Sequence, residues 1–114
     1  MRKHIRQACL SANKNKGLFQ GVRTALPAHT LAILSRLAPG GYVKSGEYVA
    51  LSPLRADRHV GSFKFNIRKG IGADFATGWK GDLIDLAAAL SGGSKLEGAR
   101  NLARMMGMEV SGHD

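Results

Sequence analysis

The chain has 114 residues, of which 44% are hydrophobic, and it contains a single cysteine, Cys9. This length suits one domain rather than two, and the hydrophobic content argues against global disorder. A lone cysteine can form neither a disulfide within the chain nor a cysteine-based metal site, and it suits a reducing compartment. The sequence has no apolar run long enough to cross a membrane, and no long apolar segment follows the basic N-terminus as a signal peptide would require. We therefore expect a cytoplasmic protein that does not interact with membranes.

The net charge of +9 is unevenly distributed along the chain. Residues 1–46 contain eight Lys or Arg and no Asp or Glu, whereas residues 47–114 contain nine Lys or Arg and eight Asp or Glu. A basic half joined to a nearly neutral half is a common electrostatic footprint of a nucleic-acid-binding protein. Anionic lipid or an acidic protein partner would also suit this charge, and a basic surface can simply be solvated.

The first 25 residues predict a basic, flexible N-terminal arm. Residues 2–10 could form a short helix with a thin apolar side, and the sequence NKNKG at residues 13–17 is typical of a polar turn. A single domain is expected over residues 26–110, followed by a short tail at residues 111–114.

The domain is expected to begin with a helix over residues 26–38. Pro27 suits the first turn of such a helix, and Gly40 lies where it would end. Its predicted apolar face consists of Leu31, Leu34 and Ala38.

Strand patterns follow the helix. Residues 48–51 predict one strand, residues 62–68 alternate between apolar and polar side chains, and residues 71–75 predict a returning strand after a turn at Lys69 and Gly70. We assign four apolar side chains of these strands to the core: Phe63, Phe65, Ile67 and Phe75. Two tyrosines are expected in structural roles: Tyr42 and Tyr48.

The last third of the chain predicts two helices. Asp82 can cap the first helix, and the spacing of Ser94 and Glu97 is that of a capping box at the start of the second. Gly107 is placed as the C-cap of the second helix. The order of helix, three short strands and two helices predicts an α+β domain, in which N-terminal and C-terminal helices pack on one small antiparallel sheet.

The order of motifs over residues 47–106 resembles the zinc-ribbon domain of bacterial, phage and plasmid DNA primases. In that family a strand leads into Cys-Pro-x-His, then a Ser-Phe pair, a hairpin, Cys-Phe-x-Cys-Gly, and a helix that starts with Gly-Asp. The corresponding sequences in this chain are YVALSPLR at residues 48–55, GSF at 61–63, DFATG at 74–78 and GDLIDL at 81–86. The resemblance covers about half of the chain and implies a zinc-ribbon-like sheet and a role related to primases.

The chain departs from this family at all four metal-ligand positions. These positions are occupied by Ser52, Arg55, Asp74 and Thr77. A structural zinc site needs four ligands, mainly thiolate or imidazole, and arginine cannot act as one because it stays protonated. We therefore expect a zinc-ribbon-like fold without metal or any other cofactor.

The resemblance brings Arg55 and Asp74 to neighbouring ligand positions, where they could form an ion pair that replaces the metal. The hydroxyl groups of Ser52 and Thr77 could accept hydrogen bonds from nearby turn amides. The alternative is that Arg55 and Asp74 are both solvated, in which case a surface pair would contribute little to stability.

The predicted nucleic-acid-binding residues are those of the polar strand face and the loops around it. Cations at these positions could contact phosphates without reading sequence. They are Arg55, Arg58, Lys64, Arg68, Lys69 and Lys80. Trp79 could stack on a base, or it could pack against the last helices as part of the core. The polar strand face could equally be an ordinary solvated surface.

No nucleophile–base set is evident in the sequence, so a catalytic role is not expected. The charge distribution favours a non-catalytic accessory module that binds nucleic acid, with single-stranded DNA favoured, and the resemblance to primases implies a role in the replication of a mobile element. The alternative is a module that docks on a replication protein such as a primase, helicase or polymerase, without contacting DNA.

Overall fold

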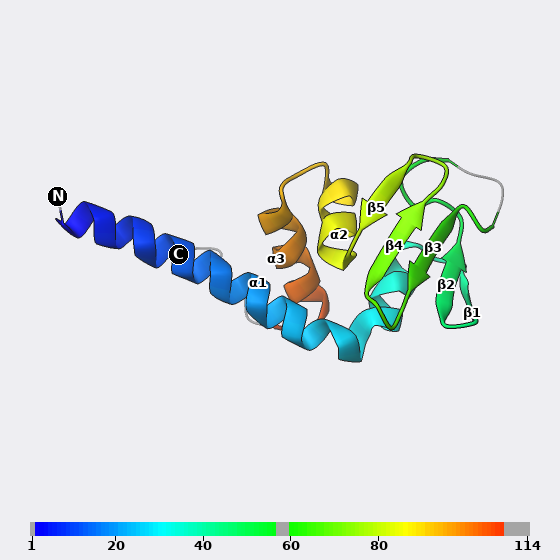
Figure 1. The fold of residues 1–114 in the computed structure, drawn as a ribbon, viewed down its shortest axis with the longest axis horizontal. Helices are drawn as coiled ribbons and strands as arrows, with labels where there is room; N and C mark the ends of the chain where they lie inside the picture. The colour runs from blue at the N-terminus through cyan, green and yellow to red at the C-terminus, as the bar shows by residue number, and fades with distance from the viewer. Residues whose placement is uncertain (1, 57–59, 109–114) are drawn as a thin grey trace.

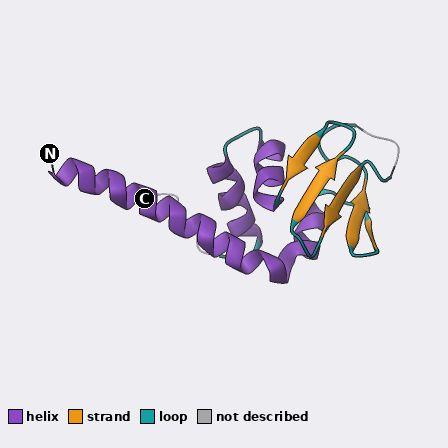
Figure 2. Cartoon of the chain, viewed as in Figure 1, coloured by secondary structure: helices purple, strands orange, loops and turns teal. Residues whose placement is uncertain are grey.

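The fold is α+β, as predicted, with three helices and one five-stranded antiparallel sheet among the described residues (Figures 1 and 2). The computed structural model describes the backbone of residues 2–56 and 60–108 and the side chains of residues 16–56 and 60–108. Arg58 and the tail at residues 111–114 lie outside these ranges. The elements are α1 (Arg2–Leu37), β1 (Tyr42–Lys44), β2 (Glu47–Ala50), β3 (Phe63–Asn66), β4 (Ile71–Asp74), β5 (Trp79–Gly81), α2 (Leu83–Ser91) and α3 (Lys95–Met105).

The predicted boundary between an N-terminal arm and the domain at residues 25 and 26 is wrong, because one continuous helix, α1, crosses it. Val22 is completely buried, and Leu18, Phe19 and Leu26 pack against the core, so this part of α1 belongs to the domain. Tertiary packing of these side chains outweighs the weak helix propensity of the NKNKG segment. The N-terminal part of α1 extends away from the body of the molecule (Figure 1).

Pro27 lies inside α1 rather than in its first turn. Proline has no amide hydrogen, so the carbonyl of Arg23, four residues earlier, loses its helical hydrogen bond, and the proline ring pushes against that carbonyl. In Figure 1, α1 changes direction in its light-blue part, as expected for a proline bend. After the bend the buried side chains are Thr30, Ile33, Leu34 and Ala38, whereas the predicted core residue Leu31 is 45% exposed.

The sheet is a simple antiparallel meander in the order β1-β2-β3-β4-β5. Strands β1 and β5 were not predicted, because each has only three residues and is too short to show an alternating pattern. Ser45 and Gly46 join β1 to β2 with φ angles of 52° and 78°. Two consecutive positive φ angles are typical of the tightest hairpin turn, which favours glycine.

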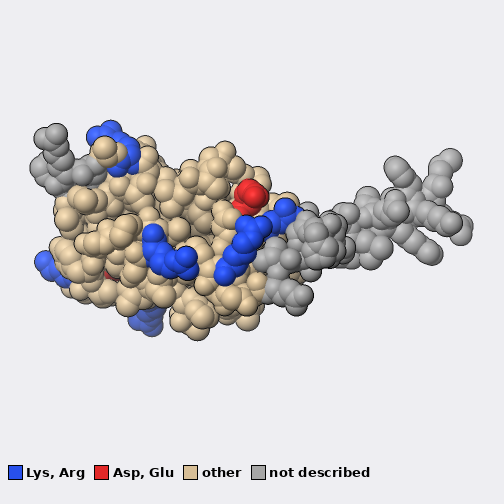
Figure 3. Space-filling model, turned by 180° about the vertical axis from the view of Figure 1, so that it is seen from behind, with Lys and Arg blue, Asp and Glu red and all other residues tan. Residues whose placement is uncertain are grey.

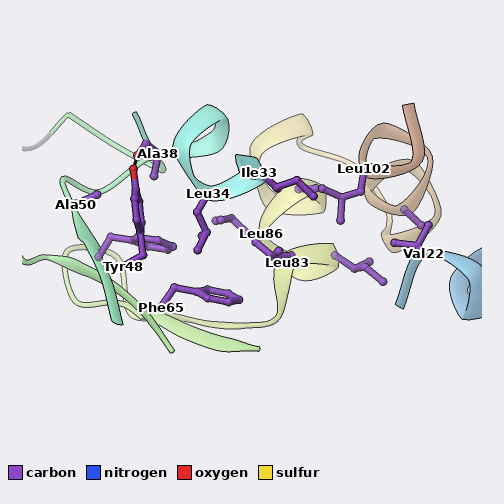
Figure 4. Packing of buried hydrophobic residues seen from close by; sticks show 14 of the residues in the cluster. Val22, Ile33, Leu34, Ala38, Tyr48, Ala50, Phe65, Leu83, Leu86 and Leu102 are labelled. Carbon is purple, nitrogen blue, oxygen red and sulfur yellow. Dashed lines mark hydrogen bonds between the residues drawn. The ribbon is translucent and has the colours of Figure 1, made fainter. Parts of the chain in front are cut away.

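The core lies between one face of the sheet and the three helices (Figure 4). Phe63 and Phe65 of β3 are completely buried, as predicted, and Ile67 is partly buried and packs against the core cluster. Leu34 of α1, Leu86 of α2 and Leu102 of α3 also belong to this cluster. Because the described helices supply this core from one side, the opposite face of the sheet is left for solvent.

Tyr48 has the structural role that was predicted for it. Its buried hydroxyl donates to the carbonyl of Ala38 at 2.6 Å and accepts from the amide of Gly41 at 3.1 Å. A Cβ atom at Gly41 would lie 2.5 Å from the Tyr48 ring, so only glycine allows this approach. The contact fixes the first strands against the end of α1.

The C-terminal helices begin at the predicted caps. The Asp82 carboxylate accepts from the Asp85 amide at 2.8 Å, and the Asp85 carboxylate accepts from the Asp82 amide at 3.0 Å. Ser94 caps α3 by accepting from the Glu97 amide at 3.2 Å. Gly107 directly follows the observed C-cap of α3, Met106, and has the expected positive φ.

Asp85 lies 3.2 Å from Lys95 and thereby links the starts of the two helices. Partial burial raises the pKa of Asp85, but hydrogen bonds from the Asp82 amide and from Lys95 outweigh that effect and hold the pKa below its usual range.

Candidate nucleic-acid interface

The outer face of the sheet carries exposed lysines from three different strands. In an antiparallel sheet, residues directly opposite each other project from the same face. The register therefore aligns one row across all five strands, namely Tyr42, Val49, Lys64, Ala73 and Lys80. A second row contains Lys44, Glu47, Asn66 and Ile71. Lys44, Lys64 and Lys80 are all exposed to solvent.

Two aromatic side chains lie on this same face. Tyr42 is 51% exposed, although a structural role was predicted for it. Phe75 is 69% exposed, so its assignment to the core is wrong. The amide of Phe75 donates to the carbonyl of Ser62 at 2.7 Å, which continues the ladder between β3 and β4 by one residue. By strand alternation, Phe75 then projects on the same side as Ala73 and the lysines.

A groove of about 350 Å³ runs over the β1 side of this face. It is lined by Tyr42, Lys44, Ser45, Glu47, Val49, Val60, Gly61 and Lys64. The groove thus passes between an exposed aromatic ring and two lysines, and Glu47 is its one acidic residue. We call the exposed side chains of Tyr42, Lys44, Lys64, Phe75 and Lys80 the sheet platform.

The structure brings together only part of the predicted binding set. Lys64 and Lys80 lie in one row of the outer face, with Ala73 between them. Arg68 and Lys69 are exposed in the turn between β3 and β4, beyond the end of the strand. Arg55 is exposed in the chain that follows β2, and Arg58 lies outside the described residues.

Trp79 is partly buried and packs against the core, which agrees with the second of its two predicted roles. It is directly opposite the buried Asp74, and its ring lies 6.2 Å from that of Phe63 in a stacked arrangement. It belongs to β5. The exposed aromatic rings on the solvent side are those of Tyr42 and Phe75.

Two of the four positions that would hold zinc in a ribbon, Ser52 and Asp74, are joined by a hydrogen bond between their side chains. Asp74 is only 1% exposed, and its carboxylate accepts from the Ser52 hydroxyl and from the amide of Ala76 at 2.9 Å. Ser52 also accepts from the amide of Leu54 at 3.2 Å, and Thr77 accepts from the amide of Trp79 at 3.3 Å. The predicted role of the two hydroxyls in holding turn amides is thus confirmed.

The predicted Arg55–Asp74 ion pair is not formed. Arg55 is exposed, whereas the Asp74 carboxylate is enclosed and already hydrogen-bonded by Ser52 and Ala76. Burying a guanidinium beside Asp74 would require removing its water, and a short hydroxyl can reach the carboxylate without that cost. Within residues 16–56 and 60–108, no group of three or more His, Cys, Asp or Glu side chains could hold a metal ion.

Replacing Asp74 tests this hydrogen-bonded connection. Asp74→Ala leaves the Ser52 hydroxyl and the Ala76 amide without this partner in a buried site, so we expect a loss of about 2 kcal/mol in the free energy of unfolding. Arg55→Ala is the control, and it should change stability by less than about 0.5 kcal/mol because its side chain is exposed. Urea denaturation would measure both values. Equal losses in the two variants would restore the ion-pair hypothesis.

No protein-family model matches the chain, and no curated protein sequence matches it significantly. No helix in the described part of the chain combines the length and the apolar character that crossing a membrane requires. The nature of the site is therefore inferred from the geometry and charge of its side chains.

Tyr42 and Lys44 were missed because β1 was not predicted. Phe75 was missed because the strand over residues 71–75 was assigned the wrong inner face. Its more apolar positions, including Phe75, point outward, while Gly72 and Asp74 point inward. The residue sizes across the β3–β4 hairpin could have indicated the correct inner face. Phe65 is opposite Gly72, where a Cβ atom would lie 2.4 Å from the Phe65 ring, so the large residues of β3 require a small partner on β4.

Proposed function

We propose that this protein binds single-stranded nucleic acid on the outer face of its sheet, with single-stranded DNA favoured. The observation that supports this proposal is that exposed Tyr42 and Phe75 share one face with exposed Lys44, Lys64 and Lys80. Lysines contact phosphates without reading sequence, and aromatic rings stack on unpaired bases.

A single strand fits this arrangement better than a duplex does. Stacking on a protein side chain needs the flat face of a base, which is covered by neighbouring base pairs in a duplex. Val49 and Ala73 lie between the platform side chains in the same row and are small, so an extended strand can lie flat across the sheet. Seen from the side opposite to Figure 1, the surface also shows much more Lys and Arg than Asp and Glu (Figure 3), which favours a polyanion.

The resemblance to primase zinc ribbons gives this proposal a biological setting. We propose a non-catalytic, cytoplasmic accessory module that acts on template or displaced strands during the replication of a mobile element. The buried contact between Ser52 and Asp74 lies at two of the four ligand positions of that family. A ribbon that has lost its metal could keep its loops together through this contact.

Docking on a replication protein is the second candidate function. It is favoured by exposed apolar side chains on the same side of the sheet, where Ile71 is 56% exposed and Phe75 is 69% exposed. Aromatic and apolar side chains are also typical of protein interfaces. The two functions differ in their dependence on salt and on nucleic acid.

A salt titration of oligonucleotide binding tests the proposal. If three to five lysines and arginines contact phosphates, the logarithm of affinity for single-stranded DNA should fall against the logarithm of salt with a slope of about −2 to −3.5. Lys64→Ala should make that slope shallower by about 0.7, the contribution of one phosphate contact. Fluorescence anisotropy with a labelled oligonucleotide measures both quantities.

Duplex of the same sequence is the comparison ligand, and it should bind more weakly at every salt concentration. Failure to bind any oligonucleotide at about 20 mM salt, where electrostatic attraction is strongest, would favour the docking function.

A further inference from the structure

A second groove lies on the other side of the β3–β4 hairpin, between the hairpin turn, the bend of α1 and the start of α2. It has a volume of about 280 Å³. It is lined by Arg23, Leu26, Pro27, Thr30, Phe65, Ile67, Arg68, Lys69, Gly70, Asp82 and Leu83. We call it the bend groove. It shares no lining residue with the groove on the outer face of the sheet.

The shape of the bend groove is set by rigid features on both sides. Pro27 bends α1 at this point, and Thr30 donates its hydroxyl to the Leu26 carbonyl at 2.9 Å. Opposite, the turn that carries Arg68 and Lys69 is held by Asn66, whose side-chain carbonyl accepts from the Lys69 amide at 2.8 Å and whose main-chain carbonyl accepts from the Gly70 amide at 2.8 Å. Because both walls are fixed, the groove exists without a ligand to form it.

The bend groove combines three cations with an apolar floor. Arg23, Arg68 and Lys69 are exposed and come from two different elements. The apolar floor that solvent can reach is supplied by Leu26 and Ile67, which are partly buried, and by Pro27, which is exposed. Phe65 and Leu83 also line the groove but are almost completely buried. Arg23 also lies over the Phe19 ring, with its guanidinium carbon 5.5 Å from the ring centre, which limits how far it can move.

One carboxylate, Asp82, lines the groove, but it is already used in the fold. Its Oδ1 accepts from the Asp85 amide as the cap of α2, and the Asp82 amide is bound in turn by Asp85. The start of α2 therefore offers no free capping position for an anion, and the one negative charge of Asp82 against the positive charges of Arg23, Arg68 and Lys69 leaves the groove lining net positive. The chemistry of the bend groove is set by the three cations and the apolar floor.

We propose that the bend groove binds a nucleoside 5′-phosphate, with the base on the apolar floor and the phosphate between Arg23, Arg68 and Lys69. A simple anion would satisfy the cations and leave the apolar floor in water, and a neutral nucleoside would do the reverse. Only a ligand with both parts uses the whole surface. Guanidinium groups are suited to phosphate because their planar donors match its oxygens, and Lys69 adds a further charge. The ligand is either a free nucleotide or the phosphorylated 5′ end of a strand.

Calorimetric titration of the full chain with adenosine monophosphate, adenosine and inorganic phosphate tests the proposal. Adenosine monophosphate should bind at least about 10-fold more tightly than either fragment. Arg23→Ala and, separately, Arg68→Ala should each weaken it roughly 10-fold or more, the effect of losing one charged hydrogen bond. Lys64→Ala is the matched control on the sheet platform and should leave this affinity unchanged.

Labelled oligonucleotides with and without a 5′-phosphate identify the source of the ligand. A phosphate-dependent gain that is lost in Arg23→Ala assigns the bend groove to a strand end, whereas binding of the free nucleotide alone assigns it to a nucleotide. The proposal is overturned if inorganic phosphate binds as tightly as adenosine monophosphate. It is also overturned if Arg23→Ala and Arg68→Ala bind every phosphate-bearing ligand with the same affinity as the unchanged chain. Because the bend groove does not include the sheet platform, its failure and that of single-strand binding are separate results.

Discussion

Gly98→Ala is expected to lower the free energy of unfolding by about 3 kcal/mol, although alanine is the better helix former. Gly98 is buried in α3, where this helix crosses α2. A Cβ atom at residue 98 would lie 2.6 Å from the carbonyl oxygen of Ile84 and 2.7 Å from the amide nitrogen of Ala88. Both atoms belong to the backbone of α2 and cannot turn aside as a flexible side chain could. The two helices must move apart, which opens the core around Leu86 and Leu102.

Gly17→Ala provides a matched control for this prediction. Gly17 also lies inside a helix, but it is exposed and a Cβ atom there would meet nothing within 4 Å. The same substitution should therefore raise stability by about 0.5–1 kcal/mol, the usual helix preference for alanine over glycine. Urea denaturation monitored by circular dichroism measures both changes. Similar effects of the two substitutions would mean that α2 and α3 do not pack as closely as described.

The helix ends and the central strand could be predicted because each carries a local signal. Asp82 and Ser94 are polar residues placed just before apolar helical stripes, and both act as the predicted caps. The alternation of Phe63 and Phe65 with Lys64 and Asn66 correctly assigns the two faces of β3. Such features depend on neighbours within a few residues, so the sequence contains nearly all of the information about them.

The length of α1 could not be predicted, because it depends on partners that are distant in sequence. Val22 is buried beside α3, which follows it by more than 70 residues, and Met108 also packs against this region. Without those contacts, the local sequence around Gly17 favours a turn. Long-range packing thus extends the helix through a segment whose own preference is weak.

The candidate site was only partly predictable for a similar reason. Lys64 could be placed on the outer face from its own strand, but Tyr42 and Lys44 belong to a strand of three residues that is defined by pairing with β2. Phe75 was placed in the core on hydrophobicity alone. Phe65 requires a glycine opposite it, so Gly72 must point inward and Phe75 outward, the reverse of the predicted faces of this strand. The partner of Asp74 depends on the same assignment of faces, since Asp74 points inward and bonds to Ser52 while Arg55 is exposed to solvent.

Reversing two charges in the sheet platform is expected to lower the affinity for single-stranded DNA by about 100-fold at roughly 50 mM salt. Lys64→Glu with Lys80→Glu replaces two cations of one row by two anions, which removes two phosphate contacts and adds repulsion at the same place. The logarithmic salt slope should become shallower by about 1.4, since each phosphate contact on a single strand contributes about 0.7. Both side chains are exposed, so the free energy of unfolding should change by less than about 0.5 kcal/mol.

Two control variants separate the sheet platform from net charge. Arg36→Glu with Arg104→Glu changes the net charge equally at exposed positions near the ends of α1 and α3, outside the platform, and should weaken binding only a few-fold. Phe75→Ala leaves the charge unchanged and should weaken binding about 10-fold without altering the salt slope, because stacking releases no counterions. If the two charge-reversed variants lose affinity equally, the strand is attracted by overall charge and not held on this face of the sheet. If Phe75→Ala binds as the unchanged chain does, the lysines act without base stacking, and the preference for single strands must come from elsewhere in the protein.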